Sequence, residues 1–295
     1  MMAMLLPFSP IAHAKSAETL RLAPSSQWNV HYADESCRMS RSFGEGDQQI
    51  LMVARRFEPG GGLRMSLIGK AMRAHDDGKV TIIFGPSQTE QSYGFFAARL
   101  SDKTPVINLR GEVRLIPLTE AQKETNKLAY KRGLSPPEWP SPTEAQEAAI
   151  SYIEIRKRSS PAYILETGSL GPVMKIMRDC TDELLRQWGV DPERHKALTR
   201  PATPKTRFTN WITSDDYPRD MLERGSRAVV QFRLHVNEQG GATACHIQQS
   251  TRPAAFDQAV CKALIRNAAF DPALDANGVA LPSYWHNTVI FDIPY

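Results

Sequence analysis

Hydrophobic and polar residues alternate in several short segments between residues 27 and 118. A period of two places the apolar side chains of a segment on one face, which is typical of a β-strand. Glycine and proline clusters such as Gly85-Pro86 separate the segments and indicate turns. The expected strands are residues 28–32, 50–57, 63–68, 80–84, 95–100 and 106–116. Strands in succession with short connections predict an antiparallel sheet or a small sandwich.

Two later segments follow a helical pattern. Thr143 is a suitable N-cap for a helix over about 144–152. Between residues 172 and 188, apolar side chains recur every three or four residues, which predicts a helix with one buried face. That stripe consists of Leu170, Met174, Met177, Cys180, Leu184 and Trp188. Residues 153–158 and 163–166 fit neither pattern decisively. The fold class is therefore α+β, with an antiparallel, β-rich N-terminal domain over residues 25–190 that helices close.

The last part of the chain combines strands with one helix. In residues 228–236, apolar residues at even positions from 230 onward alternate with polar ones, which predicts a strand with one buried side. Gly240 and Gly241 suit a two-residue hairpin turn, because glycine accepts positive φ. Such a turn would place Val236 opposite Cys245. Phe256, Val260 and Leu264 then predict a helix that ends before Phe270-Asp271-Pro272, and residues 288–293 predict a last strand.

The four cysteines can pair within these elements. Cys245 would point inward from the hairpin, and Cys261 lies on or beside the helix stripe, so we predict a disulfide between them. Cys180 faces the core of its own domain, and Cys37 lies in a strand pattern, which predicts a second disulfide. An even number of cysteines without a Cys-x-x-Cys motif suits an oxidising compartment. Ordinary buried thiols are the alternative.

The N-terminus and the charge distribution bear on location. Residues 1–11 are mostly apolar, and Ala12-His13-Ala14 follows a cleavage pattern, so residues 1–14 are expected to be a signal peptide that lacks a positive start. A flexible apolar N-terminus of a cytosolic protein is the alternative. No other apolar run approaches the ~20 residues of a membrane span. We therefore expect an exported protein with at most peripheral membrane contact.

Basic residues collect in the first two thirds of the chain. Residues 208–295 hold seven Lys or Arg against nine Asp or Glu, a net charge of −2. Because the whole chain has a net charge of +4, residues 1–207 carry +6. Residues 191–207 contain three prolines and five basic residues, which predicts a stiff basic linker. A basic surface on an exported protein would meet anionic lipid head groups or wall polymers rather than nucleic acid. The simpler interpretation, which we favour, is a solvated charged surface without a specific partner.

Patterns for catalysis are sparse. No His-Glu-x-x-His, Gly-x-Ser-x-Gly or phosphate loop occurs, so no enzyme activity is expected. In the expected hairpin His235 faces His246, but neighbouring arginine and glutamine are poor metal ligands, and no metal or cofactor is expected. The enzyme alternative would need a deep cleft in the N-terminal domain, involving His31, Asp34 or His75.

Residues 208–295 contain a series of further motifs: Tyr217-Pro218, Gly225, Val229-Val230-Gln231-Phe232, Val236, Gly240-Gly241, Ser250, Phe256-Asp257, Phe270-Asp271-Pro272-Ala273, Gly278 and Val289-Ile290-Phe291. In order and spacing these motifs resemble those of the TonB C-terminal domain family, the periplasmic end of an energy transducer that works outer-membrane transporters. The resemblance implies a small β-β-α-β domain in the periplasm and covers under a third of the chain.

The resemblance also implies a binding site. In the family, an extended receptor segment pairs with the edge of the last strand, where unpaired backbone groups accept another strand. That edge would be Asn287, Thr288, Val289, Ile290, Phe291 and Asp292. We therefore expect a periplasmic protein that binds a peptide or an outer-membrane receptor in energy-dependent transport. A homodimer through the same edge, with a structural role in the envelope, is the alternative. A complete transducer would also have a membrane helix and a Pro-rich spacer, where a signal peptide and a folded domain are expected here.

Overall fold

In the first part of the chain, eleven strands of the described residues form one sheet, antiparallel except for the parallel pair β1 and β11. The computed structural model describes residues 19–74, 78–132, 136–137, 139–158, 160–251 and 253–293. The strand order is β1-β11-β10-β6-β7-β8-β5-β4-β3-β2, and β9 pairs with β5. The strands are β1 (Thr19–Leu22), β2 (Asn29–Ala33), β3 (Ser36–Phe43), β4 (Ile50–Arg56), β5 (Gly62–Ile68), β6 (Gly78–Gly85), β7 (Gln91–Arg99), β8 (Pro105–Leu109), β9 (Val113–Arg114), β10 (Tyr152–Lys157) and β11 (Ala162–Leu165). Short 3-10 turns, η1 (Gly46–Gln48) and η2 (Lys70–Met72), follow β3 and β5.

Three helices accompany this sheet: α1 (Glu120–Lys131), α2 (Glu144–Ala149) and α3 (Gly171–Gln187). The expected stripe of α3 packs into the core of the sheet, with Met174, Met177 and Leu184 all buried. Thr119 and Thr143 begin α1 and α2 with capping boxes, in which the threonine hydroxyl accepts from a backbone amide three residues on. Helix α1 was not expected from the sequence. It buries none of its residues, so its pattern contains no apolar stripe.

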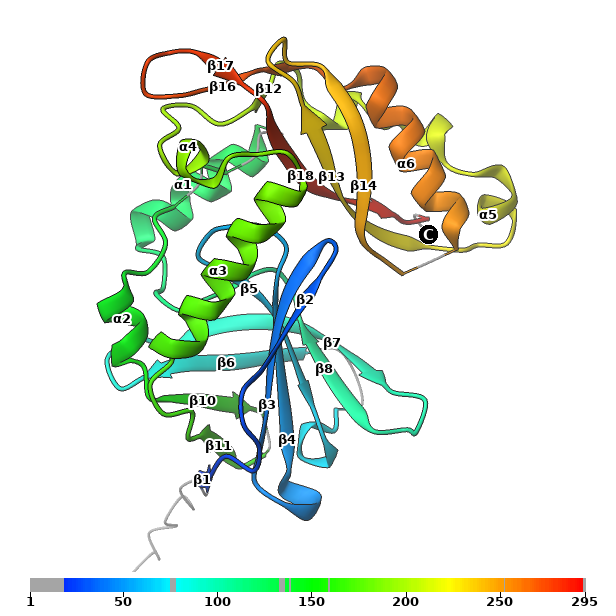
Figure 1. The fold of residues 1–295 in the computed structure, drawn as a ribbon. Coiled ribbons are helices and arrows are strands. Elements are labelled where there is room, and N and C mark those ends of the chain that lie inside the picture. The colour runs from blue at the N-terminus through cyan, green and yellow to red at the C-terminus, as the bar shows by residue number, and fades with distance from the viewer. Residues whose placement is uncertain are drawn as a thin grey trace, which may run out of the picture.

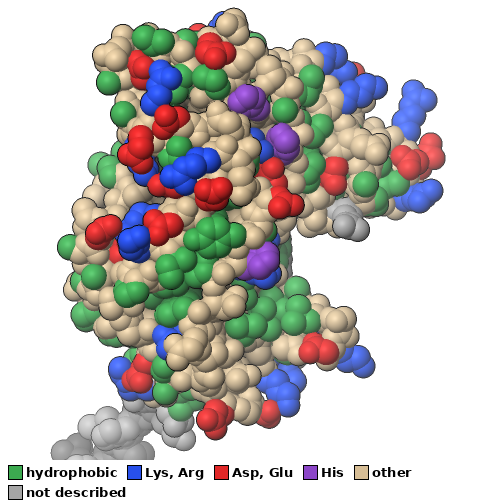
Figure 2. Space-filling view, in the orientation of Figure 1, with side chains coloured by type: hydrophobic (Ala, Val, Ile, Leu, Met, Phe, Trp, Pro, Cys, Tyr) green, Lys and Arg blue, Asp and Glu red, His purple; other side chains and the backbone are tan. Residues whose placement is uncertain are grey.

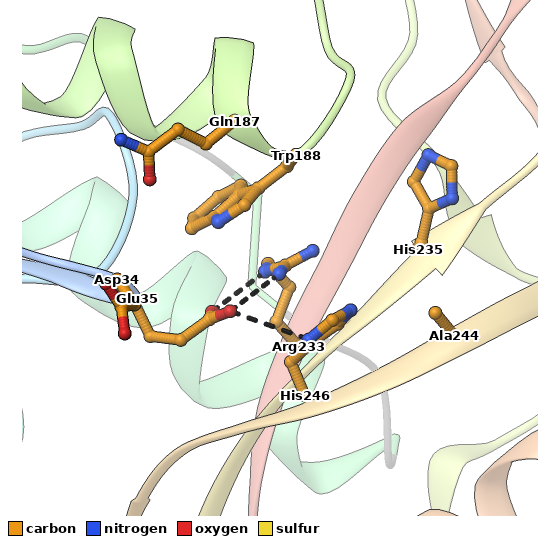
Figure 3. A pocket seen from close by; sticks show the side chains of 8 residues that line it. All are labelled: Asp34, Glu35, Gln187, Trp188, Arg233, His235, Ala244 and His246. Atoms are coloured by element: carbon orange, nitrogen blue, oxygen red, sulfur yellow. Dashed lines mark hydrogen bonds and ion pairs between the residues drawn. The ribbon is translucent and has the colours of Figure 1, made fainter.

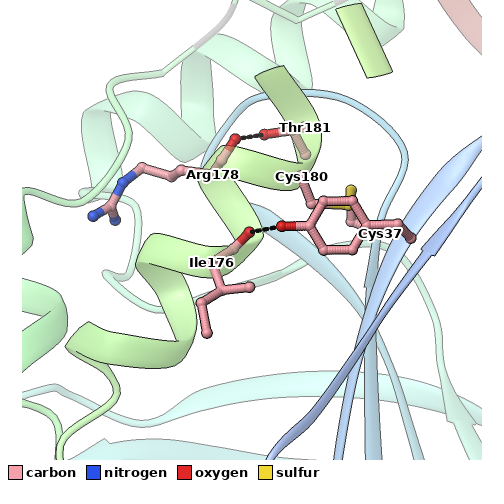
Figure 4. The surroundings of a disulfide bond; sticks show 6 residues. Cys37, Ile176, Arg178, Cys180 and Thr181 are labelled. Carbon is pink, nitrogen blue, oxygen red and sulfur yellow. Dashed lines mark hydrogen bonds between the residues drawn. A yellow bond between two sulfur atoms is a disulfide. The ribbon is translucent and has the colours of Figure 1, made fainter. Parts of the chain in front are cut away.

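The disulfide between Cys37 and Cys180 ties β3 to α3, as predicted. Figure 4 shows it between the strand and the helix, together with Ile176, Arg178 and Thr181 of the helix. Beside it, the hydroxyl of Tyr32 donates to the carbonyl of Ile176 at 3.4 Å. The helix is therefore attached to the sheet by a covalent bond as well as by apolar packing.

Residues 191–207, which the sequence suggested as a linker, contain a helix and a strand. Helix α4 (Pro192–Lys196) begins at Asp191, whose carboxylate accepts from two backbone amides. Strand β12 (Thr203–Pro204) pairs with β15 (Phe270–Asp271) of the last part of the chain. Ion pairs connect α4 in both directions, from Lys196 to Asp182 and from Arg194 to Asp275. This segment is packed against both parts of the chain.

The last part forms a three-stranded antiparallel sheet in the order β14-β13-β18, with α6 against one face. Figure 1 shows it lying at one end of the larger sheet, beyond the β2–β3 hairpin and the end of α3. Its elements are η3 (Phe208–Asn210), η4 (Ser214–Asp216), α5 (Arg219–Glu223), β13 (Ala228–Val236), β14 (Ala242–Ser250), α6 (Ala254–Asn267), β16 (Ala273–Leu274), β17 (Ala280–Leu281) and β18 (Ser283–Phe291). The apolar face of β13 and the Phe256–Val260–Leu264 stripe of α6 meet in one core, as predicted. The last strand begins five residues earlier than expected.

The hairpin register differs from the prediction. Val236 pairs with Ala242, and Leu234 rather than Val236 faces Cys245. The loop is longer than two glycines because the Asn237 carboxamide accepts from the amides of Gln239 and Gly241. A shift of two residues leaves each side chain on the same face. For that reason the predicted disulfide between Cys245 and Cys261 still forms.

Gly240, in this loop, is fixed by a close approach of the chain. Its φ is +80°, and a Cβ there would lie 1.9 Å from the carbonyl oxygen of Phe270. The Phe270 amide donates to the Gly240 carbonyl at 2.9 Å, which joins the hairpin loop to β15. Glycine is required here both for the positive φ and for the space.

Candidate functional site

Strand β18 lies at one edge of the C-terminal sheet. Strand β13 pairs with β14 on one side and with β18 on the other. On the side of β18 away from β13, no strand of the described part of the chain pairs with it. An edge of this kind presents backbone donors and acceptors to a further strand.

The direction of the backbone groups on β18 follows from β13. The Val229 amide donates to the Thr251 hydroxyl and its carbonyl accepts from the Thr251 amide, so Val229 turns its backbone toward β14. Its partner Ile290 is then in a non-hydrogen-bonded pair and turns its amide and carbonyl to the open edge. Because the direction of the backbone groups alternates along a strand, Thr288 also turns its amide and carbonyl to the open edge. Accordingly, the Thr288 amide donates to the neighbouring Asn287 side chain, at 2.8 Å.

The side chains of the predicted edge residues fall on two faces. Val289 and Phe291 are buried on the face toward α6, where the Phe291 ring lies 4.7 Å from that of Phe256. Ile290 points the other way and is 69% exposed, beside the partly exposed Val229. Five of the six residues thus belong to β18. The sixth, Asp292, lies one residue past its end and pairs with Arg227 at 3.0 Å.

The first half of β18 is held against the N-terminal domain. The Tyr284 ring lies 5.3 Å from Trp188, at the end of α3, and 5.1 Å from His195 on α4. Two residues further along the strand, His286 Nε2 lies 3.6 Å from a Glu58 carboxylate oxygen. Within the described residues, no aromatic contact or ion pair joins the stretch from Asn287 to Phe291 to the N-terminal domain.

Part of the outer face of the C-terminal sheet, around Arg233 and Gln231, is covered by the N-terminal domain. This was not predicted: Arg233 and Gln231 were expected to face solvent, yet their exposure is 2% and 7%. Glu35, at the tip of the β2–β3 hairpin, accepts two hydrogen bonds from the Arg233 guanidinium, at 2.9 and 3.2 Å. The same guanidinium lies 3.9 Å from the centre of the Trp188 ring, a cation–π contact. Figure 3 shows these groups converging from three elements.

A cavity of about 330 Å³ lies at this junction. It is lined by Asp34, Glu35, Gln187, Trp188, Arg233, His235, Ala244 and His246. The two histidines do not face each other, because Arg233 pairs with His246 and His235 pairs with Ala244. Burial lowers the pKa of both histidines, and the charge on Arg233 lowers it further. Both imidazoles are therefore neutral at neutral pH.

The remaining residues considered for chemistry are not brought together. Asp34 lines the junction cavity, whereas His31 lies on the exposed part of β2 and His75 falls outside the described residues. The cavity lies between the domains and not within the N-terminal one. Within the described ranges, no three His, Cys, Asp or Glu side chains are grouped to hold a metal. The junction itself escaped prediction, because a strand face with Gln231, Arg233 and His235 resembles a solvated one.

An open edge strand on a helix-covered β-β-α-β sheet defines a module for protein interaction. Residues 214–293 match the family model for the Gram-negative bacterial TonB protein C-terminal, so this part of the chain is a TonB C-terminal domain, as predicted. No curated protein and no solved structure matches the chain. Domains of this family act in protein interaction in the Gram-negative envelope. Among the described helices, none is both long and apolar enough to cross a membrane.

Proposed function

We propose that this protein binds an extended peptide segment of another envelope protein along the open edge of β18. The observation that supports the proposal is the pair of edge-facing backbone groups at Thr288 and Ile290. An outer-membrane transport receptor is the partner class that the family suggests. The proposed location is the periplasm, where the two disulfides would persist.

Affinity and selectivity would come from different parts of the edge. Each net backbone hydrogen bond is worth about 0.5–1.5 kcal/mol, so a few bonds alone give weak binding. The incoming strand must also displace the Asn287 carboxamide from the Thr288 amide. Ile290 and Val229 lie together on the outer face and favour an apolar side chain at the matching position of the peptide.

The N-terminal domain has a positioning role in this proposal. Glu35, Trp188 and Glu58 contact the outer face of the sheet through Arg233, Tyr284 and His286. A peptide would therefore add at a domain whose orientation is fixed relative to the rest of the protein. A force applied at β18, or a change in its position when a peptide binds, would be transmitted to the N-terminal domain through these contacts.

A proline at position 290 tests the proposal. The Ile290→Pro change removes an edge-facing amide without removing an amide that bonds to β13, and Ile290 buries little surface. Ile290→Ala is the matched control, because it trims the same side chain and keeps the amide. We expect synthetic peptides from the N-terminal segments of outer-membrane receptors to bind the wild type and the alanine variant, but not the proline variant, by fluorescence anisotropy.

Self-association is the second function that the edge supports, because the Val229–Ile290 pair is apolar and exposed. Two copies could pair through β18 about a two-fold axis. Analytical ultracentrifugation of the wild type and Ile290→Pro separates the two functions. A monomeric wild type that binds peptide supports the module; a dimer that the proline variant breaks supports assembly. Equal peptide binding by the wild type and the proline variant would contradict edge pairing.

A further inference from the structure

Three arginines stand side by side on neighbouring strands of the N-terminal sheet. Arg38 on β3 pairs directly with Arg55 on β4, and Arg55 pairs directly with Arg64 on β5. Directly opposed residues of antiparallel strands point to the same face. The three guanidinium groups therefore form one row, which we call the arginine row.

The row lies on the sheet face that turns away from α3. Cys37 and Met39, on either side of Arg38, are buried, and Cys37 is bonded to Cys180 of the helix. Alternation along the strand then directs Arg38 to the opposite face. All three arginines are partly accessible.

The row is also close to the C-terminal domain. The Arg55 guanidinium lies 5.8 Å from the centre of the Phe57 ring. The Phe57 carbonyl in turn accepts a hydrogen bond from Gln248 of β14. Figure 2 shows the surface hollowed on one side where the lobes of the two domains meet. The arginine row thus lies at the ends of its strands that are nearest to the second domain.

Within the described residues, none of the three guanidinium groups of the row has a carboxylate within 4.0 Å, whereas other arginines of the sheet, such as Arg21 and Arg156, form ion pairs. Glu112 lies over Gly62, two residues from Arg64, and does not reach this distance. Arg64 Nε is buried and has no hydrogen-bond partner. Burial lowers the pKa of Arg55, and the charge on Arg38 lowers it further.

Such an arrangement is unfavourable for the free protein. Like charges directly opposite on adjacent strands destabilise a sheet. The arginine row contains two such pairs, Arg38 with Arg55 and Arg55 with Arg64. Arginine is also the side chain whose planar fork binds phosphate and carboxylate groups through two hydrogen bonds at once. Neighbouring strands are about 4.8 Å apart, so the row offers a fork at each of three closely spaced positions.

In the next row along the same strands, Val53 on β4 is flanked by neutral hydrogen-bonding groups. Ser40, Ser66 and Asn108 lie on the same face, one step of the pleat away, on β3, β5 and β8. The Ser66 hydroxyl already donates to the Asn108 side-chain oxygen at 2.6 Å, which leaves the Asn108 amide hydrogens available. A ligand on the arginine row would therefore meet donors at its side as well.

We propose that the arginine row is a binding site for a ligand that carries two or more neighbouring phosphate groups, either a free oligophosphate or the phosphorylated head group of a lipid. Phosphate groups offer several acceptor oxygens each and so match the number of donors in the row. The site is separate from the β18 edge, and it uses the basic excess of the N-terminal part of the chain.

Binding of sodium tripolyphosphate to the full chain, by isothermal titration calorimetry in low salt, tests the site. Arg55→Gln removes the middle of the row, and we expect it to weaken binding about tenfold or more. The matched control is Arg99→Gln on β7, whose guanidinium donates to the Lys103 carbonyl; its effect should stay within about twofold. Should Arg55→Gln fail to fold, Arg38→Gln carries the same expectation.

A second arm identifies the source of the phosphate. Vesicles of phosphatidylcholine with phosphatidylinositol 4,5-bisphosphate, whose head group carries two neighbouring phosphates, are compared with vesicles of phosphatidylcholine alone in a sedimentation assay. Retention on the first and not the second, lost in Arg55→Gln, supports a lipid head group; binding of tripolyphosphate without retention supports a free oligophosphate. Absence of both, or equal binding by wild type and Arg55→Gln, would overturn the proposal.

Discussion

Removing the Glu35 carboxylate should destabilise the junction between the domains strongly. In Glu35→Ala, Arg233 would remain at a site where its side chain is 2% exposed, without its two charge-assisted hydrogen bonds. Breaking a fully buried ion pair costs about 3–5 kcal/mol. Glu35 itself is partly exposed, and the contact of Arg233 with Trp188 persists. We therefore expect a loss of about 2–3 kcal/mol in the free energy of unfolding.

The assay is denaturant unfolding followed by tryptophan fluorescence, to which Trp188 in the junction contributes. The double variant Glu35→Ala with Arg233→Met removes both charges, so it should recover most of the loss, because no buried charge remains unpaired. Asp47→Ala breaks the exposed pair with Lys70 and serves as the control, with an expected effect below about 0.5 kcal/mol. A Glu35→Ala effect as small as the control, or no recovery in the double variant, would refute this account of the junction.

Three further predictions concern pH, the long disulfide and the edge amide. The lowered pKa of His246 means that the unfolded state takes up more protons as pH falls through about 6.5, so the free energy of unfolding should fall between about pH 7 and 5.5. His246→Asn should make this fall shallower in unfolding curves at both pH values, and an unchanged slope would count against it. Replacing Cys37 and Cys180 by alanine opens a loop of 143 residues and should cost up to about 5 kcal/mol in the same assay; a cost near zero would contradict a stabilising bridge. Asn287→Ala frees the Thr288 amide and should tighten peptide binding about fivefold in anisotropy titrations, whereas weaker binding would mean that the carboxamide takes part in recognition.

Local patterns of the sequence were sufficient for much of the fold. Alternation with glycine and proline boundaries located β4, β5, β6 and β8, because each of these strands has one face in the core. The stripes of α3 and α6 were predictable for the same reason, since each helix buries a single side. Both disulfides followed from the inward direction of their cysteines, which depends only on the face and not on the register.

The features that the sequence did not reveal depend on contacts between distant segments. Helix α1 buries nothing, so no periodic signal marks it. The hairpin register depends on the Asn237 side chain and on the approach of Phe270 to Gly240. The polar face of β13 resembles a solvated one, yet Arg233 is buried there against Glu35. This partner is 198 residues away in the sequence, so no local pattern marks the contact. The open edge itself could be placed only once the strand order was known.

Amide hydrogen exchange at β18, measured by NMR on the full chain, tests the proposed binding edge most directly. In the free protein, the Ile290 amide should exchange much faster than the Val289 amide, which faces β13. Addition of a receptor-derived peptide should then slow exchange at Ile290 and leave Val289 unchanged. An Ile290 amide that is already protected in the free monomer, or that stays unprotected with bound peptide, would contradict pairing at this edge.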